Sequence, residues 1–462
     1  MLNFLCRMSV VVVAISPVIA SGEDATAPTP VARRVIKDLP PPFDTPSVRN
    51  QPKVIGWKAG QTPTAPDGFT VSSYGDEIEN PRWIYVLPNG DTLVSQCRSL
   101  TDDQRQRYQQ KRDARIEARE AAEKANRPID DDAIRPIDVS DGPEDSSNQI
   151  MLYRDAEGDG VPELVTPFFK GLTQPFGMTV IGNTFYVAAT DGVYAMDYSE
   201  GQTEITDEPR IVFPLPAGGY NQHWTRNLIA TPDGKHLLVT VGSGSNIAEH
   251  GLDAERLRAC ILRIRRDGTG VMMYGEGIRN PVGMAFNPAT GHLWTACNER
   301  DKLGDDLVND YITSVRPGDF FGWPWTYLGD RRDPRLGDER RELSRREFAT
   351  PALVPDVPVG AHTASLGLTF YTGDRFPDRY RGGAFIGQRG SWNRSELAGY
   401  RVAFVPMDAD GKPAGAPEDF LGGFIQDPQH VHGRPVGVAT LADGSILVAD
   451  EKGNRLWRVA AE

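Results

Sequence analysis

The feature that most constrains the fold of this chain is a repeated two-strand unit. Each copy has a polar lead-in, an apolar strand, a Gly-rich or Asp-containing turn and a second apolar strand. Six copies occur, and they read NPRWIYVLPNGDTLVSQ, QPFGMTVIGNTFYVAA, TRNLIATPDGKHLLVTVG, NPVGMAFNPATGHLWTAC, SLGLTFYTGDRFPDRYRGGAFIGQ and RPVGVATLADGSILVADE. Apolar alternation between such turns, with almost no long amphipathic helix, is typical of an all-β array.

Units of this kind that close on themselves form a β-propeller, which leaves only short, protected sheet edges. The last copy ends almost at the C-terminus, while residues 55–73 offer further strands ahead of the first copy. A propeller uses such N-terminal strands to complete its final blade. Two unrelated β-sandwiches are the alternative, but six matches to one unit argue against them. We therefore predict an all-β, six-bladed β-propeller over residues 49–462.

Three segments do not fit the repeat. Residues 1–20 carry one basic residue, an apolar stretch and a small-residue end, which predicts a signal peptide; a single membrane anchor is the alternative. Residues 21–48 are rich in Pro and predict a linker or a surface arm. Residues 101–147 contain strong helix formers with charges all around, which predicts a solvated helical insertion, with docking of a redox partner as a second interpretation.

Charge and cysteine content narrow the class of protein. The formal net charge of the 462-residue chain is -13, without a basic stripe, and this field repels nucleic acid and anionic lipid. After signal cleavage only Cys97, Cys260 and Cys297 remain, so the chain has at most one disulfide. No Cys-x-x-Cys-His haem motif occurs, and no cysteines have zinc-ligand spacing. We expect a periplasmic or secreted protein without a membrane span after cleavage.

Polar, bulky residues stand where the first strand of each copy begins. Inner strands of a propeller run roughly along its axis, so these positions are expected to meet at one mouth of the channel. The set that gathers there is Asn80, Arg82, Gln174, Gln222, His223, Trp224, Arg226, Arg279, Asn280, His362, Ser365, His432 and Arg434. For any single member, pairing or packing between blades is an equally good interpretation. Several cations on one rim of an acidic protein nevertheless favour a polyanionic ligand, such as a multi-carboxylate cofactor.

These residues lie within motifs that identify a family by resemblance. The motifs are HWTRNLIATPDGKHLLVTVGSGSN, GEGIRNPVGMAFNPATGHLWTACNERDKLGDDLVND, GDFFGWPWTYLGD, HTASLGLTFY, RGSWNRS and GRPVGVATLADGSILVADEKGNRLWRV. From about residue 48 to the C-terminus the chain resembles the soluble sugar dehydrogenases that depend on pyrroloquinoline quinone (PQQ), the aldose and L-sorbosone dehydrogenase group. The resemblance implies a quinoprotein that oxidises an aldose or a sorbosone-type sugar at its hemiacetal or aldehyde carbon by hydride transfer to PQQ.

The resemblance also implies site residues. His223 matches the base that takes the sugar hydroxyl proton, a role that suits a neutral imidazole. The cofactor-binding positions it implies are Arg279, Asn280, Arg394, His432 and Arg434, to which Ser365 is added from the same mouth. Gln174 and Trp224 are expected to contact the substrate. The backbone carbonyls of Asp301 and Lys302 are expected to hold the cofactor's Ca²⁺, a hard cation that prefers oxygen ligands.

Some features depart from the family pattern. Gln388 and Arg389 stand where related sequences often carry histidine, so the lining there differs. Asp305 and Asp306 are either ligands of a second calcium or ordinary surface carboxylates, and the latter is the simpler interpretation. Because a haem motif is absent, electrons are expected to pass to a separate acceptor, a quinone or a cytochrome. The alternatives are a non-catalytic propeller that binds a carbohydrate or protein, and a calcium-dependent lactonase, against which the cationic rim argues.

Overall fold

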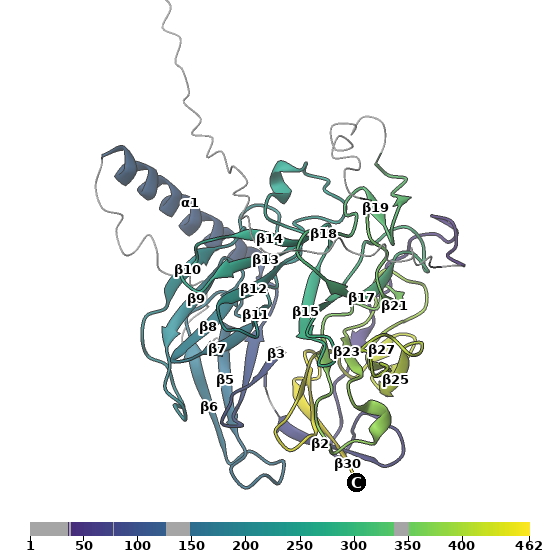
Figure 1. Cartoon of the computed structure of the whole chain (residues 1–462). Coiled ribbons are helices and arrows are strands. Elements are labelled where there is room, and N and C mark those ends of the chain that lie inside the picture. The colour runs from purple at the N-terminus through teal and green to yellow at the C-terminus, as the bar shows by residue number, and fades with distance from the viewer. Residues whose placement is uncertain (1–35, 37, 77, 126–147, 337–350) are drawn as a thin grey trace, which may run out of the picture. The chain divides into compact units, whose positions relative to one another are not determined.

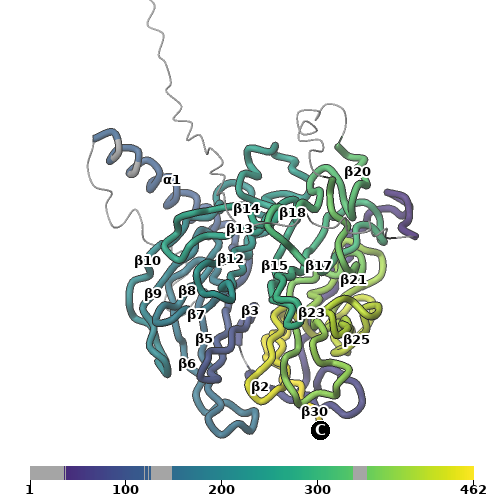
Figure 2. Tube along the Cα trace, viewed as in Figure 1, coloured from purple at the N-terminus to yellow at the C-terminus, as the bar shows by residue number. Residues whose placement is uncertain are grey.

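The repeated hairpins fold into antiparallel strand pairs in the computed structural model of this chain (Figure 1). The structure describes the residues from 36 onward, except 37, 77, 126–147 and 337–350, as the coloured trace shows (Figure 2). Ile36–Glu462 form one compact unit. The expected signal peptide, residues 1–20, and the first part of the expected arm lie outside the described residues.

Six sheets of four or five strands make up most of the described chain. The first contains β3 Pro81–Val86, β4 Thr92–Cys97, β5 Asn148–Arg154 and β6 Leu164–Lys170. The second contains β7 Met178–Ile181, β8 Thr184–Ala189, β9 Gly192–Asp197 and β10 Arg210–Pro214. The third contains β11 Leu228–Ala230, β12 His236–Val241, β13 Cys260–Arg265, β14 Met272–Glu276 and β18 Asp319–Phe320.

The remaining three large sheets follow the same plan. The fourth contains β15 Pro281–Phe286, β16 Leu293–Cys297, β17 Asn309–Val315 and β21 Val357–Ala361. The fifth contains β22 Thr369–Phe370, β23 Ala384–Gln388, β24 Arg401–Val405 and β25 Glu418–Leu421. The sixth contains β28 Pro435–Thr440, β29 Ile446–Asp450, β30 Arg455–Ala461 and β2 Phe69–Asp76.

Smaller elements complete the described chain. A three-stranded sheet joins β1 Lys53–Val54, β27 His430–Val431 and β26 Ile425–Asp427, and β19 Thr326–Tyr327 pairs with β20 Arg331–Arg332. Short 3-10 helices span Asp253–Glu255 and Asp378–Tyr380. Among the described residues, no helix has the length and apolar character to cross a bilayer.

Each predicted repeat is an antiparallel hairpin, namely β3–β4, β7–β8, β11–β12, β15–β16, β22–β23 and β28–β29. The strand ahead of the first repeat, β2, pairs with the last strand, β30, in a register that runs from Phe69↔Ala461 to Asp76↔Arg455. This confirms the prediction that N-terminal strands complete the sheet of the last repeat. Both ends of this part of the chain are thereby held in one sheet.

Glycines in the first strands let neighbouring sheets approach closely. A Cβ on Gly283 of β15 would lie 2.7 Å from the Leu368 backbone nitrogen, beside β22. A Cβ on Gly437 of β28 would lie 2.6 Å from the Arg82 carbonyl oxygen in β3. The first and second sheets meet through the Trp83 and Phe176 rings, whose centroids are 5.3 Å apart. Apolar side chains from both sheets fill the space between, and the core therefore lies between sheets.

One α-helix occurs among the described residues, α1 Asp102–Lys124. It begins with a capping box, because Thr101 Oγ1 accepts the Gln104 N–H and Gln104 Oε1 accepts the Thr101 N–H, at 3.2 and 3.0 Å. Most of its side chains are exposed, but Gln104 and Tyr108 are buried, and Tyr108 packs with Ala217. The N-terminal half of this helix is thus docked on the sheets, in contrast to the fully solvated helix that its charge pattern suggests.

Cys97, Cys260 and Cys297 are all free and buried. Burial raises the pKa of all three thiols, that of Cys97 to about 12, which disfavours the reactive thiolate.

Candidate active site

His223 stands just ahead of β11, in contact with the segment that follows β12. Its Nδ1 lies 2.9 Å from the Ser243 carbonyl oxygen and 3.0 Å from Ser243 Oγ. A carbonyl oxygen only accepts hydrogen bonds, so Nδ1 carries the proton in the neutral ring and Nε2 keeps its lone pair. Burial and then the charge of Arg279 hold the pKa of His223 well below its usual range. The ring is therefore a neutral acceptor with a fixed tautomer.

Asn280 lies against His223 across Gly242. A Cβ on Gly242 would lie 2.4 Å from Asn280 Oδ1 and 2.6 Å from His223 Cβ. Asn280 is buried, and its Oδ1 has no hydrogen-bond partner within the described part of the chain. A buried acceptor without a partner is costly, and a ligand that donates a hydrogen bond here would relieve that cost.

Arg279 is fully buried and saturated with hydrogen bonds. Its guanidinium donates to the carbonyl oxygens of Asn246, Asn298 and Glu299, to Asn246 Oδ1 and to Asp301 Oδ2, at 2.7–3.2 Å. Burial alone would raise the pKa of the Asp301 carboxyl, but His362 and Arg279 hold it below its usual value. Arg279 thus fixes the loop after β16 and supplies positive charge beside His223, with every N–H already engaged by protein.

A cluster of four cations surrounds one carboxylate at the end of β29. Arg82, Arg389 and Lys452 lie within ion-pair distance of Glu451, Arg82 at 3.2 Å and Lys452 at 3.6 Å. Glu451 is buried; burial alone would raise its pKa, but Arg389 and Arg82 hold it far below the usual range. Arg434 is the fourth cation, and burial followed by the charge of Arg389 lowers its pKa. We call these five residues the Glu451 cluster.

The Arg434 guanidinium has no carboxylate within 4.0 Å among the residues that the structure describes, although the Arg434 backbone N–H donates to Asp450 Oδ1 at 2.6 Å. Its Nη2 donates to the Tyr400 hydroxyl at 3.1 Å, and its guanidinium carbon lies 5.1 Å from the Tyr400 ring centroid. The Tyr400 hydroxyl in turn donates to the Ser391 carbonyl oxygen at 2.7 Å. The residue is only 7% exposed. A buried cation without a counter-ion is unfavourable unless an anion joins it.

Trp224 connects His223 to the Glu451 cluster. The Arg82 guanidinium lies 4.9 Å from the Trp224 ring centroid, and Trp224 Nε1 donates to Ser99 Oγ at 3.1 Å. The structure thus links the base position, Asn280, Arg279 and the Glu451 cluster through successive contacts. Gln174 belongs to the second sheet's lead-in, where its backbone N–H donates to Asn148 Oδ1 and its side-chain amide to the Arg98 carbonyl oxygen.

The other predicted residues are hydrogen-bonded elsewhere. Ser365 is fully buried and bonds Thr363 and Gln388 within the protein. His432 stacks on Trp57, and its Nδ1 lies 2.8 Å from the Gly56 carbonyl oxygen. Arg394 donates to the Asp305 carbonyl oxygen and pairs with Asp306, both at 2.8 Å. Of these three, the structure joins none directly to the Glu451 cluster, and their assignment to a cofactor stays a prediction.

The two residues expected to hold a metal differ in their surroundings. The Asp301 carbonyl oxygen accepts hydrogen bonds from Asn246 Nδ2 at 3.2 Å and from Arg335 Nη1 at 2.6 Å. The Lys302 N–H donates to Asn393 Oδ1 at 2.7 Å. The Lys302 carbonyl oxygen accepts no hydrogen bond from the described residues. One of the two carbonyls is thus open to a cation, and the other is engaged by protein.

Sequence reasoning missed Glu451, Lys452 and the contact of Arg389 with them. It considered residues that begin the first strand of each hairpin, whereas these residues follow the second strand. An antiparallel hairpin returns to its starting edge, so both positions lie at one end of the sheet. Applied to the ends of LVADEK and FIGQR, this rule would have added Glu451, Lys452 and Arg389 to the candidate residues.

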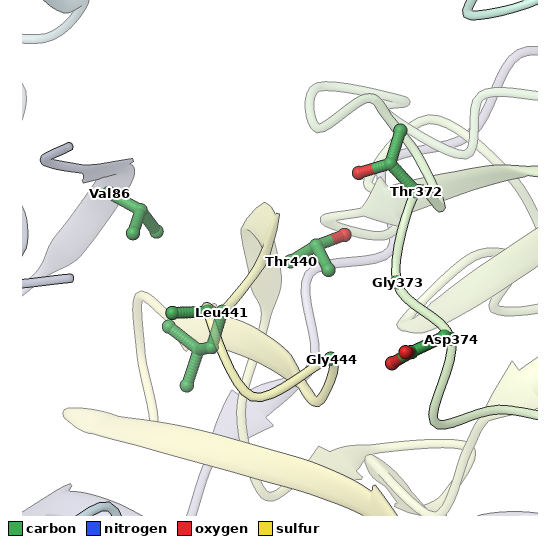
Figure 3. Close-up of a pocket in the computed structure, with 8 residues that line it drawn as sticks. Val86, Thr372, Gly373, Asp374, Thr440, Leu441 and Gly444 are labelled. Carbon is green, nitrogen blue, oxygen red and sulfur yellow. The ribbon is translucent and has the colours of Figure 1, made fainter.

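A shallow pocket lies at the other ends of these strands. Its lining comes from the end of β3 and the β28–β29 turn, together with the segment after β22, and comprises Val86, Thr372, Gly373, Asp374, Thr440, Leu441, Ala442 and Gly444 (Figure 3). Arg434 precedes β28 and Leu441 follows it, so this pocket is separate from the Glu451 cluster.

Known proteins share both sequence and fold with this chain. The family model for glucose/sorbosone dehydrogenase matches residues 184–396, and a TrAA12-like model matches residues 341–461. An aldose sugar dehydrogenase of Escherichia coli is 25% identical over 203 residues, which cover 41% of this chain and 51% of that protein.

Two solved structures extend the likeness over most of the chain. The holo form of the PQQ domain of a Coprinopsis cinerea pyranose dehydrogenase has a TM-score of 0.64 at 17% identity, covering 87% of this chain and 97% of that one. The calcium structure of a Trichoderma reesei family AA12 enzyme has a TM-score of 0.65 at 17% identity, covering 89% and 98%.

The fold is nearly all-β, as in the propeller-like proteins among its structural neighbours, and the candidate site brings together a neutral histidine and buried cations. Residues 184–396, a little under half of the chain, match the glucose/sorbosone dehydrogenase model, and together with the sugar dehydrogenases among the relatives this match supports that family.

Proposed function

We propose that this chain is a PQQ- and calcium-dependent dehydrogenase that oxidises an aldose or a sorbosone-type sugar at its hemiacetal or aldehyde carbon. The observation that carries the proposal is the Glu451 cluster, in which three cations share one carboxylate and the guanidinium of the fourth, Arg434, has no carboxylate within ion-pair distance among the described residues. A compact cofactor with several carboxylates supplies the missing negative charge.

The site fits such a cofactor in two further respects. The unpartnered Asn280 Oδ1 can accept a hydrogen bond from a ring N–H, and the charge of Arg279 lies beside it. Likeness to a PQQ-bound domain and to a calcium-containing enzyme supports the same pair of cofactors. Arg434, Arg389 and Asn280 would hold the cofactor, and the Lys302 carbonyl would contribute to calcium binding. The quinone, when bound, accepts a hydride from the sugar carbon.

His223 performs the proton chemistry in this proposal. Nε2 takes the sugar hydroxyl proton, while Nδ1–H remains bonded to the Ser243 carbonyl oxygen. An anion bound near Arg279 offsets the positive field that lowers the His223 pKa, and so strengthens the base when the cofactor is present. Trp224, next in the chain, offers a ring for the sugar, and Gln174 an amide.

We further propose that the six sheets are the blades of one closed propeller over residues 49–462. Residues 1–20 would be a signal peptide, 21–48 a surface arm and 101–147 an insertion. The protein would act in the periplasm or outside the cell, and a quinone or cytochrome would take the electrons. Contacts between consecutive first strands, including Val180 N–H to the Tyr85 hydroxyl at 3.0 Å, support the closure.

The test begins with protein freed of cofactor and metal. PQQ and CaCl₂ are added separately and together, and reduction of an artificial dye is followed with aldoses, sorbosone and simple aldehydes. Activity that needs both additions is the expected result. A folded protein without activity would favour a carbohydrate- or protein-binding propeller, and lactone hydrolysis with calcium alone would favour a lactonase.

Two variants separate proton transfer from cofactor binding. His223→Gln should lower kcat about 10²- to 10⁴-fold with little change in PQQ affinity, because only the base is lost. Arg434→Met should weaken PQQ binding about 10-fold or more in a fluorescence titration, because a charge-assisted hydrogen bond is lost. Arg379→Met removes an exposed ion pair with Glu418 and serves as the control. Normal turnover in the His223 variant would refute the base assignment.

A further inference from the structure

The Asp301 carbonyl oxygen already accepts a hydrogen bond from a charged side chain, the guanidinium of Arg335. It has two lone pairs, and the hydrogen bonds from Arg335 Nη1 at 2.6 Å and Asn246 Nδ2 at 3.2 Å occupy both. The resemblance described above implies that this carbonyl and that of Lys302 hold the calcium ion of the proposed function. A calcium ion binds oxygen at about 2.3–2.6 Å. It cannot share this oxygen with a guanidinium at the same distance, because two like charges would then be in contact.

Asp333 holds the other two nitrogens of the Arg335 guanidinium. Arg335 donates through Nε and Nη2 to the two carboxylate oxygens of Asp333 at 2.9 and 2.7 Å, which is a bidentate pair. Its side chain is 17% exposed, so the guanidinium borders solvent on one side. The third nitrogen, Nη1, is the one that reaches the Asp301 carbonyl.

If the Arg335 side chain moved away, the buried carboxylate of Asp333 would still have a partner. Asp333 is fully buried, but it also pairs with Arg300 Nη1 at 3.2 Å. Arg300 is itself fixed by Glu299 and by the carbonyl oxygens of Pro324 and Thr326. Asp333 therefore keeps one counter-ion when Arg335 moves, whereas loss of the only partner of a buried carboxylate would be strongly unfavourable.

We propose that Arg335 and a calcium ion compete for the Asp301 carbonyl oxygen, with Arg335 filling the position in the metal-free protein and swinging toward solvent when calcium enters. This inference rests on the proposed function, which supplies the calcium ion. When no calcium is bound, the Arg335 guanidinium supplies the positive charge beside the loop that follows β16. Calcium affinity is then lower than the carbonyl ligands alone would give, because the ion must displace a bonded arginine.

The test is calcium binding to the full chain, measured by calorimetric titration of metal-free protein with CaCl₂, with and without PQQ. Arg335→Met keeps the aliphatic stem and removes the charge. The matched control is Arg331→Met, which removes an arginine whose Nη2 donates to the Ile36 carbonyl oxygen instead. We expect Arg335→Met to bind calcium about 10-fold more tightly than the wild type, and Arg331→Met to bind it unchanged. Arg335→Lys, which keeps a charge on a shorter donor, should lie between the two.

The outcomes separate this inference from the proposed function. Equal calcium affinity in the wild type and Arg335→Met would overturn the competition and leave the calcium-dependent dehydrogenase intact. Weaker binding in Arg335→Met would mean that Arg335 supports the metal site, which also overturns the competition. Absence of calcium binding in all variants, with and without PQQ, would overturn both. Thermal unfolding with and without CaCl₂ provides the same comparison should Arg335→Met prove less stable.

Discussion

At the scale of single residues, the site depends on backbone that comes very close to side chains. His223 and Asn280 belong to different sheets, yet they share one neighbour, Gly242, at the end of β12. Any side chain at this position would separate them. The orientation of His223 therefore depends on glycine at position 242, which leaves room for the side chain, as well as on the hydrogen bond to Ser243.

Gly242→Ala should disable the base while the fold persists. The new Cβ would lie 2.4 Å from Asn280 Oδ1 and 2.6 Å from His223 Cβ, so one of the two must shift. A displacement of this size is expected to reduce kcat about 10²-fold, measured by dye reduction with PQQ and calcium present. Gly422→Ala is the control, because nothing lies within 4 Å of its Cβ position. Full activity in Gly242→Ala would show that this contact is not needed.

The residues of this site were only partly predictable from the sequence. Polar residues mark the start of each first strand, so His223, Asn280 and Arg434 could be named as candidates from the sequence. Glu451 was missed because its role depends on Arg82 and Arg389, which approach it from two other sheets. The hydrogen bond from Arg335 to the Asp301 carbonyl has no sequence signal, since a loop far from any repeat makes it.

At the scale of elements, α1 is tied to the second sheet through a half-buried carboxyl group. The buried Tyr108 lies beside the carboxyl group of Asp191, which follows β8. Burial raises the pKa of Asp191 to about 6, against the hydrogen bonds and the charge of Arg115 that lower it. The charge pattern of α1 predicted the helix. It did not predict this contact, because the contact involves only one face of the first turns of α1.

Asp191→Asn should change the pH dependence of stability. A carboxyl group whose pKa is raised on folding contributes stability below its unfolded pKa, and this contribution is lost as pH rises through the folded pKa. The wild type should therefore lose stability relative to Asp191→Asn between about pH 4 and about pH 6, by up to about 2 kcal/mol. Urea unfolding across this range measures the difference. Asp197→Asn, at an exposed position of β9, should show no such trend; a flat difference for Asp191→Asn would contradict the interpretation.

At the scale of the whole described chain, the fold is held together by the pairing of β2 with β30. The repeats predicted this pairing, because six hairpins leave one sheet short of a strand and β2 is the strand that precedes them. What the repeats did not predict is the aromatic cluster that anchors it. Phe69 of β2 meets Phe376, Tyr380 and Phe420 with ring centroids 4.7–5.5 Å apart, all in edge-on geometry.

Phe69→Ala should destabilise the whole unit rather than one edge of it. The Phe69 ring belongs to a strand of the sixth sheet and packs on residues in and beside the fifth sheet. Its removal therefore weakens the contact between β2, near the start of the described chain, and residues near its end. We expect a loss of about 3–5 kcal/mol in the free energy of unfolding, with one cooperative transition retained. Phe43→Ala, at a side chain 55% exposed, should change stability by less than about 0.5 kcal/mol. If Phe69→Ala instead produced an early, separate transition confined to β2, the closing strand would be an independent edge, and stability would have to come from the individual sheets.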